Sequence, residues 1–165
     1  MTQDAFQPSR LASDTVAALQ AHGRVLTVNW GQETFDIEPP HDDIQRGDVQ
    51  PTLGVVLNHS NSVVFYYVWE IDIDEQMAPR FAEFTARANE DLYTSALELN
   101  IDGGSLMLRA GIEFGDLAGA LSPEHFTGLL VNALDECERA AYLHLDAVAS
   151  LAGGASPLDA LAKVA

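Results

Sequence analysis

The sequence contains a single cysteine, Cys137, in 165 residues. One cysteine cannot form a disulfide within the chain, so an apolar core has to stabilise the fold. Hydrophobic residues make up 47% of the sequence, which is enough for a chain of this length to bury a core without cross-links or metals. Leu134 and Ala141 lie about one turn on either side of Cys137 on a predicted helix. We therefore expect its thiol to be a core group and not a reactive one.

Long apolar runs and a leader sequence are also missing. No stretch approaches the about 18 apolar residues that a membrane helix needs. The first ten residues, MTQDAFQPSR, have no basic stretch followed by an apolar run, which a secretory signal would show. We therefore expect a cytoplasmic protein that has no membrane partner.

Basic residues are scarce. Eight lysines and arginines face 25 aspartates and glutamates, so the formal net charge is −17. A field of this sign repels phosphate backbones and disfavours direct binding of nucleic acid. It attracts basic partners, although the same acidity can also serve only to keep the protein in solution.

Motifs that carry catalysis or hold a cofactor are absent from the sequence. Gly103 and Gly104 have neither the lysine nor the helix start of a nucleotide-binding loop, and no cysteine and histidine have the spacing of a zinc site. His125 and His144 are too far apart on one predicted helix to share an ion, and we expect His144 to be a half-buried, hydrogen-bonded side chain. The sequence thus predicts no catalytic residue, no cofactor, no metal and no enzyme activity.

Carboxylates, in contrast, are in excess. Asp72, Asp74 and Glu75 form the densest cluster, and hard cations take ligands of this kind. A metal-dependent enzyme built on these three residues is therefore one alternative function. The cluster lacks the glycine and the terminal glutamate of an EF-hand loop, so we favour a solvated stretch that caps the following helix.

Hydrophobic periodicity predicts an α+β fold. Helices are expected from Ser9 or Ser13 to His22, from about Pro79 to Tyr93, and from Ser122 to about Leu151. Strands are expected at Arg24–Trp30, Thr34–Glu38, Thr52–Asn58, Ser62–Ile71, Ser95–Ile101 and Ser105–Phe114. Residues 39–50 have the prolines and aspartates of an exposed loop. The order is helix, strands, helix, hairpin and long helix, which is typical of an antiparallel sheet with helices packed on it.

The strand Ser62–Ile71 is apolar on both sides. Along it Val63, Phe65, Tyr67 and Trp69 alternate with Val64, Tyr66 and Val68, and a strand of this kind must be covered on both faces. Helices of the same chain can cover one face. The other face needs a further element, a second subunit or a partner. We therefore predict a protein interface, for which the candidate residues are Val64, Tyr66, Val68, Trp30 and Leu143.

The last predicted helix is long for a chain of this size. Nearly thirty residues at about 1.5 Å each give a length of about 45 Å, whereas a compact domain of this size is roughly 27–30 Å wide. The helix must either break or extend to contact another molecule. We expect a single domain over residues 1–152 and a C-terminal tail, residues 153–165, with one or two weak amphipathic turns.

Two segments resemble the YbjN family of bacterial proteins. They are RANEDLYTSALELNIDGGSLMLRAGIEF and, after a short link, LSPEHFTGLLVNALDECERAAYLHLDAV. The family has a helix that ends near an asparagine (here Asn89), two strands joined by an aspartate-glycine turn, and a long final helix. The clear resemblance covers roughly residues 79–150, and the helix and strand at residues 9–30 also fit.

The resemblance implies a fold similar to type III secretion chaperones, which are small α+β units that often form homodimers and bind other polypeptides. It supplies no catalytic residues. We therefore predict a homodimeric, chaperone-like adaptor or regulator that binds another protein, and the net charge favours a basic partner, such as a nucleic-acid-binding protein. The alternatives are an acidic DNA mimic and the metal-dependent enzyme described above.

Overall fold

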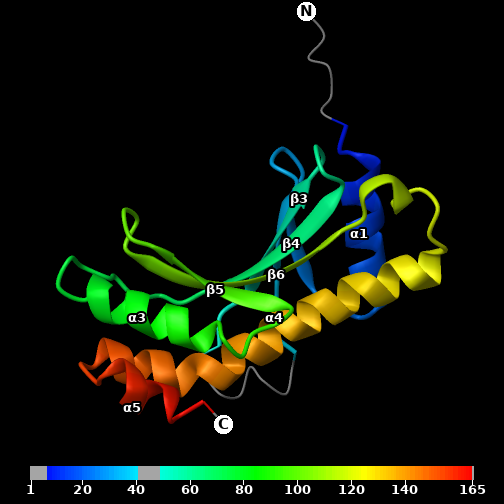
Figure 1. Cartoon of the computed structure of the whole chain (residues 1–165). Coiled ribbons are helices and arrows are strands. Elements are labelled where there is room, and N and C mark those ends of the chain that lie inside the picture. The colour runs from blue at the N-terminus through cyan, green and yellow to red at the C-terminus, as the bar shows by residue number, and fades with distance from the viewer. Residues whose placement is uncertain (1–6, 41–48, 165) are drawn as a thin grey trace, which may run out of the picture. The chain divides into compact units, whose positions relative to one another are not determined.

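The computed structural model describes residues 7–40 and 49–164 (Figure 1). Most of the predicted loop at 39–50 lies outside this range. The helices are α1 (Arg10–Ala21), α3 (Ala78–Ala88), α4 (Pro123–Ala152) and α5 (Pro157–Leu161), with a short 3-10 helix, η1 (Gly115–Leu117). The strands are β1 (Leu26–Asn29), β2 (Thr34–Ile37), β3 (Thr52–Leu57), β4 (Ser62–Val68), β5 (Ser95–Asn100) and β6 (Ser105–Glu113).

The six strands form one open antiparallel sheet in the order β1-β2-β3-β4-β6-β5. The predicted α+β class is therefore confirmed. Strands β1 and β5 lie at the two edges of the sheet. Because each face of an antiparallel strand receives every second side chain, the register of each strand pair decides which residues share a face. In the pair β5–β6, for example, Glu98 lies opposite Met107 and Ala96 lies opposite Arg109.

The chain divides into two compact units. Unit 1 consists of Met1–Phe65 and Gly111–Leu134, and unit 2 consists of Tyr66–Ala110 and Asp135–Ala165. Strand β4, strand β6 and helix α4 each contribute residues to both units. The single domain over residues 1–152 stays a prediction, and the two units are described separately below.

Helix α1 begins unit 1 at the predicted cap. The side chain of Ser9 accepts a hydrogen bond from the backbone N–H of Ala12, and the chain leaves the helix through Gly23, whose φ of 87° suits a residue without a side chain. The core of this unit is made of buried apolar side chains from α1, the first strands and the start of α4: Leu11, Val16, Leu19, Phe35, Ile37, Val56, Val63, Phe65, Phe126 and Leu130.

The core of unit 2 surrounds the second half of β4. The ring of Tyr67 contacts Trp69 and Tyr142 edge-on, at centroid distances of 5.2 and 5.9 Å. Phe81 and Phe84 of α3 are fully buried beside them in the same unit. Helix α5 contacts α3, and its Ala160 is fully buried. The predicted tail at 153–165 therefore contributes a short helix to the core of unit 2.

Several boundaries differ from the prediction. The helix expected to reach Tyr93 ends at Ala88, because Asn89 caps it and turns its side chain to strand β5. Strand β4 ends at Val68 and not at Ile71. Helix α4, by contrast, is a single helix of 30 residues, so of the two alternatives left open by the sequence, a break in the helix is the one that does not occur. None of the helices in the described part of the chain is long and apolar enough to cross a membrane.

Candidate protein-binding surface

Helices cover only one face of the unit 2 strands. Tyr142 of α4 contacts Tyr67 of β4, and Cys137 of α4 donates to the carbonyl of Leu108 on β6 at 3.7 Å. Figure 1 shows α3 on the same side of β5 and β6 as this half of α4. The residues whose side chains alternate to the opposite side form what we call the open face: Tyr66, Val68, Ala96, Glu98, Met107 and Arg109.

The centre of the open face is apolar. The hydrogen bond from Trp69 N–H to Leu106 C=O, 3.2 Å long, places Tyr66 opposite Arg109 and Val68 opposite Met107. Val68 is 37% exposed, and Tyr66 and Met107 are half-buried. The open face therefore presents a tyrosine, a valine and a methionine to solvent. Aromatic residues and methionine are enriched at protein interfaces.

An ion pair borders this apolar centre. Arg109 Nε donates to Glu98 Oε1 across strands β6 and β5, and the two side chains are 44% and 40% exposed. Partial burial and the charge of Glu98 raise the pKa of Tyr66, against the opposite effect of Arg109. The Tyr66 hydroxyl therefore stays protonated at neutral pH and can donate a hydrogen bond to a ligand.

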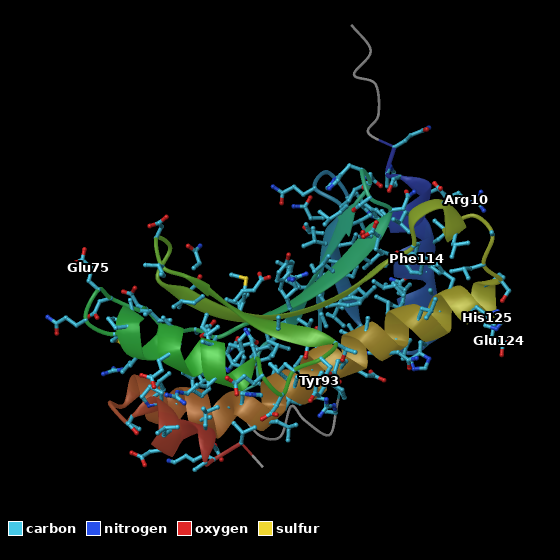
Figure 2. All side chains as sticks on the ribbon, viewed as in Figure 1. Arg10, Glu75, Tyr93, Phe114, Glu124 and His125 are labelled. Carbon is cyan, nitrogen blue, oxygen red and sulfur yellow. The ribbon has the colours of Figure 1, made fainter. Side chains whose placement is uncertain are left out.

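An acidic cleft lies at the end of the same strands. Its cavity of about 500 Å³ is lined by Asp72, Asp74, Glu75 and Asp102, together with Ile73, Ala78, Ile101, Gly103 and Gly104. The N–H of Ile73 donates to the carbonyl of Gly104 at 2.8 Å, which joins the segment after β4 to the β5–β6 turn. Figure 2 shows Glu75 on an outer loop of unit 2, before α3. We refer to the four carboxylates and their cavity as the acidic cleft.

The acidic cleft does not have the form of a metal site. Among the residues that the structure describes, no three histidine, cysteine, aspartate or glutamate side chains come together to hold an ion. Asp74 instead accepts hydrogen bonds from the N–H groups of Gln76 and Met77, at 2.9 and 2.8 Å. Asp74 thus closes the turn before α3, whereas α3 itself begins after Met77 without a side-chain cap, so Asp74 does not cap the helix directly.

Two side chains of reactive types, Cys137 and His144, lie in the core of unit 2. Burial raises the pKa of the Cys137 thiol to about 12, so the thiolate that a nucleophile needs does not form near neutral pH. His144 is buried, and burial lowers its pKa. Its Nδ1 donates to the carbonyl of Ala140 at 2.7 Å, and its ring contacts Phe84 edge-on. Cys137 is the core group expected from the sequence, whereas His144 is hydrogen-bonded as expected but is buried and not half-buried.

The structure brings together two of the five predicted interface residues. Tyr66 and Val68 share the open face of unit 2. Val64 belongs to unit 1 and is only 7% exposed, and it lies against Gly111 of β6, where a Cβ atom would come within 3.2 Å of its Cα. Trp30 also belongs to unit 1, where it follows β1 and is 40% exposed. Leu143 is half-buried on α4, on the helix-covered side of the unit 2 strands.

Four members of the open face were missed: Ala96, Glu98, Met107 and Arg109. Alternation along the predicted strands already placed Arg109 outward, and the apolar positions Leu97 and Leu99 imply that Glu98 points outward as well. The missing information was the strand order. Strand β6 lies between β4 and β5, which sets Arg109 between Tyr66 and Ala96 and within reach of Glu98.

A second hollow lies within unit 1. It has a volume of about 400 Å³ and is lined by α1 and by the chain that leads into α4, largely by alanines with Leu121 and Phe126. Its two charged residues, Arg10 and Asp14, pair with each other at 3.3 Å. Figure 2 shows Glu124 and His125 at the outer start of α4. The hollow contains no group of converging polar side chains that would orient a ligand.

The arrangement of helices and strands defines a YbjN-like α+β fold, which confirms the predicted resemblance. The solved structure of YbjN from E. coli has a TM-score of 0.55 and 10% sequence identity, over 78% of this chain and 86% of that chain. The ExsC–ExsE complex gives a TM-score of 0.37 and 14% identity, over 81% of this chain and 92% of that chain. No family model and no curated protein sequence matches the chain.

Proposed function

We propose that this protein is a non-catalytic, chaperone-like adaptor that acts as a homodimer and binds a basic segment of another protein. The observation that carries the proposal is the open face. Its centre is apolar and accessible, whereas the opposite side of the same strands is filled by α4 and α3. An apolar sheet surface of this kind is a site for a partner chain.

The acidic cleft supports a basic partner. Four carboxylates line one cavity, and none of Asp72, Asp74, Glu75 and Asp102 forms an ion pair with another described residue. A lysine or arginine side chain from the partner would offset this local charge, and the exposed Ile101 would contact its aliphatic part. A protein that itself binds nucleic acid would supply such residues. The cytoplasmic location belongs to the same proposal.

Peptide binding tests the role of the open face. The probes are a nine-residue peptide that alternates lysine and leucine and its counterpart that alternates glutamate and leucine. We expect the lysine peptide to bind and the glutamate peptide not to bind. Val68→Glu should weaken binding of the lysine peptide on the order of tenfold, since it removes an apolar contact from the open face. The added negative charge alone would strengthen binding, so charge cannot explain the loss.

Leu117→Glu is the matched control. Leu117 is an exposed leucine of unit 1, outside the open face, and its substitution changes the net charge by the same amount. It should leave binding unchanged or slightly stronger. Equal losses for Val68→Glu and Leu117→Glu would contradict the assignment of the open face.

Salt dependence tests the acidic cleft. The variant Asp72→Asn/Asp102→Asn should lose most of the salt-sensitive part of lysine-peptide binding, because electrostatic attraction is screened within about 8 Å at 0.15 M salt and about 3 Å at 1 M. Asp116→Asn/Glu124→Gln removes two exposed charges of unit 1 and serves as the control. Binding that is insensitive to salt in the unsubstituted protein would rule out the basic partner.

A further inference from the structure

The two edges of the sheet differ in how their backbone groups are satisfied. An edge strand presents a row of N–H and C=O groups to any other strand, and proteins normally block such an edge. At strand β5 the block is Asn89. Its Nδ2 donates to the carbonyl of Leu97 at 3.0 Å, and its Oδ1 accepts from the N–H of Leu97 at 2.8 Å. The side chain occupies the place that a further strand would take.

Strand β1, at the other edge, is not blocked in this way by any residue within 7–40 or 49–164. The N–H of Glu38 donates to the carbonyl of Val25 at 3.0 Å. In an antiparallel pair, alternate residues bond to the neighbour, so Val25 and Thr27 bond to β2 while Leu26 and Val28 direct their backbone groups outward. Among the described residues, none forms a hydrogen bond with the backbone of Leu26 or Val28.

The side chains along this edge are uncharged, and half of them are apolar. Residues 25–32, VLTVNWGQ, contain no charged residue, although the chain carries a net charge of −17. Val25 is 57% exposed and Trp30 is 40% exposed, while Leu26 and Val28 are half-buried. Lysine and proline, which commonly protect edge strands, are absent here. Pairing at this strand would therefore set no two like charges of β1 directly opposite each other.

We infer that the β1 edges of two copies pair antiparallel across a two-fold axis at Thr27. This inference rests on the homodimer of the proposed function and names the strand that forms it. Leu26 of each copy would exchange both backbone hydrogen bonds with Val28 of the other. The two copies of Thr27 would face each other, and threonine pairs are favourable across strands.

Neighbouring hydrogen bonds select this register. If the two-fold axis lay at Leu26, Val28 of one copy would lie opposite Arg24 of the other and would need the N–H of Arg24 as a donor. That N–H already donates to the carbonyl of Leu19 at 3.0 Å. Shifting the axis toward Val28 would require the carbonyl of Trp30, which already accepts from the N–H of Glu33 at 3.3 Å. An axis at Thr27 is the only one whose hydrogen bonds between copies need no backbone groups other than the outward N–H and C=O of Leu26 and Val28. It also sets Arg24 of one copy opposite Trp30 of the other, where a cation can stack on the indole.

Disulfide trapping tests the register. In this arrangement Thr27 forms a pair without backbone hydrogen bonds, whose Cα atoms lie about 4.5 Å apart, within the range that a disulfide spans. Thr27→Cys should give a covalent dimer on mild oxidation at micromolar concentration. Asn29→Cys is the matched control, since its two copies would lie roughly 13 Å apart along the strands. The native Cys137 is buried and should not react.

The outcomes separate this inference from the proposed function. A covalent dimer with Thr27→Cys but not with Asn29→Cys supports pairing at β1. If Thr27→Cys stays monomeric on oxidation while the unsubstituted protein sediments as a dimer, the β1 pairing is wrong and the homodimer stands. If the unsubstituted protein sediments as a monomer, the β1 pairing and the homodimer of the proposed function are both wrong. In a dimer paired at β1, Val28→Pro should yield monomers, because it removes an outward N–H and leaves the β1–β2 bonds intact.

Discussion

The side chain of Asn89 forms two hydrogen bonds with the backbone of Leu97, one through its Nδ2 at 3.0 Å and one through its Oδ1 at 2.8 Å. Asn89 is also the residue at which α3 ends. Asn89 therefore ends helix α3 and also supplies hydrogen-bond partners for the backbone of Leu97 on the edge strand β5. The carboxamide suits this double role because it carries a donor and an acceptor with the spacing of a peptide group.

Replacing Asn89 by alanine should destabilise the protein and expose the edge of β5. The N–H and C=O of Leu97 would lose their partners, at a cost of roughly 1–3 kcal/mol, and the free edge would favour association. Urea unfolding measures the first effect, and light scattering during refolding measures the second. Asn132→Ala, at an exposed position of α4, should change stability by less than about 0.5 kcal/mol. Similar losses for both variants would contradict the role given to Asn89.

Glu33 should make the stability of the protein depend on pH in the acid range. Burial alone would raise the pKa of Glu33, but hydrogen bonds from Ser9 and Asn58 outweigh it and hold this pKa below its ordinary value of 4.5. Because the folded pKa is the lower one, the contribution of Glu33 is complete above about pH 4.5 and is lost as the pH falls through the folded value.

Glu33→Gln tests this dependence. The amide can replace only one of the two oxygens that accept from Ser9 and Asn58, so we expect a loss of roughly 1–3 kcal/mol at pH 7. The difference from the unsubstituted protein should shrink when unfolding is measured near pH 3. Asp36→Asn, at an exposed position of β2, is the control. A loss for Glu33→Gln that stays constant from pH 7 to pH 3 would refute the assignment.

Gly54→Ala should destabilise unit 1 through a clash. A Cβ atom at Gly54 would lie 2.1 Å from a ring carbon of Phe35, its cross-strand neighbour. Phe35 is almost fully buried and cannot move away freely, so we expect a loss of about 1–3 kcal/mol. Gly128→Ala meets nothing within 4 Å and lies inside helix α4, where it should stabilise by about 0.5–1 kcal/mol. A lower melting temperature for Gly54→Ala and a higher one for Gly128→Ala would confirm both effects.

The elements of the fold were predicted where burial follows a local period. Helix α4 and the hairpin β3–β4 were found because their apolar residues repeat at helical and strand spacing. The serine cap of α1 was found from its position before such a repeat. Element ends were less accurate. The strand expected to end at Ile71 ends at Val68, since an apolar side chain beyond the last sheet residue looks the same in the sequence as one inside the sheet.

The open face could be predicted only in part. Alternation indicated that Tyr66 and Val68 point away from Tyr67, and this is an intrinsic property of a strand. Their neighbours depend on strand order and register, which join residues far apart in the chain, as Tyr66 and Arg109 are. The close approach of β6 to Val64 depends likewise on a distant residue, Gly111, where a Cβ atom would lie 3.2 Å from the Cα of Val64. The spacing of apolar residues along the sequence predicts neither the pairing of distant strands nor the close approach of a strand at a glycine.

The division of the chain into two units affects how the protein can fold while it is being synthesised. Neither unit is one continuous stretch: unit 1 needs residues up to Leu134, which follow the whole of Tyr66–Ala110 of unit 2. Synthesis proceeds from the N-terminus at about 5–20 residues per second. Strand β2 therefore leaves the ribosome well before the first half of α4, with Phe35 and Ile37 still lacking that part of their core. No single cut of the chain would release either unit whole.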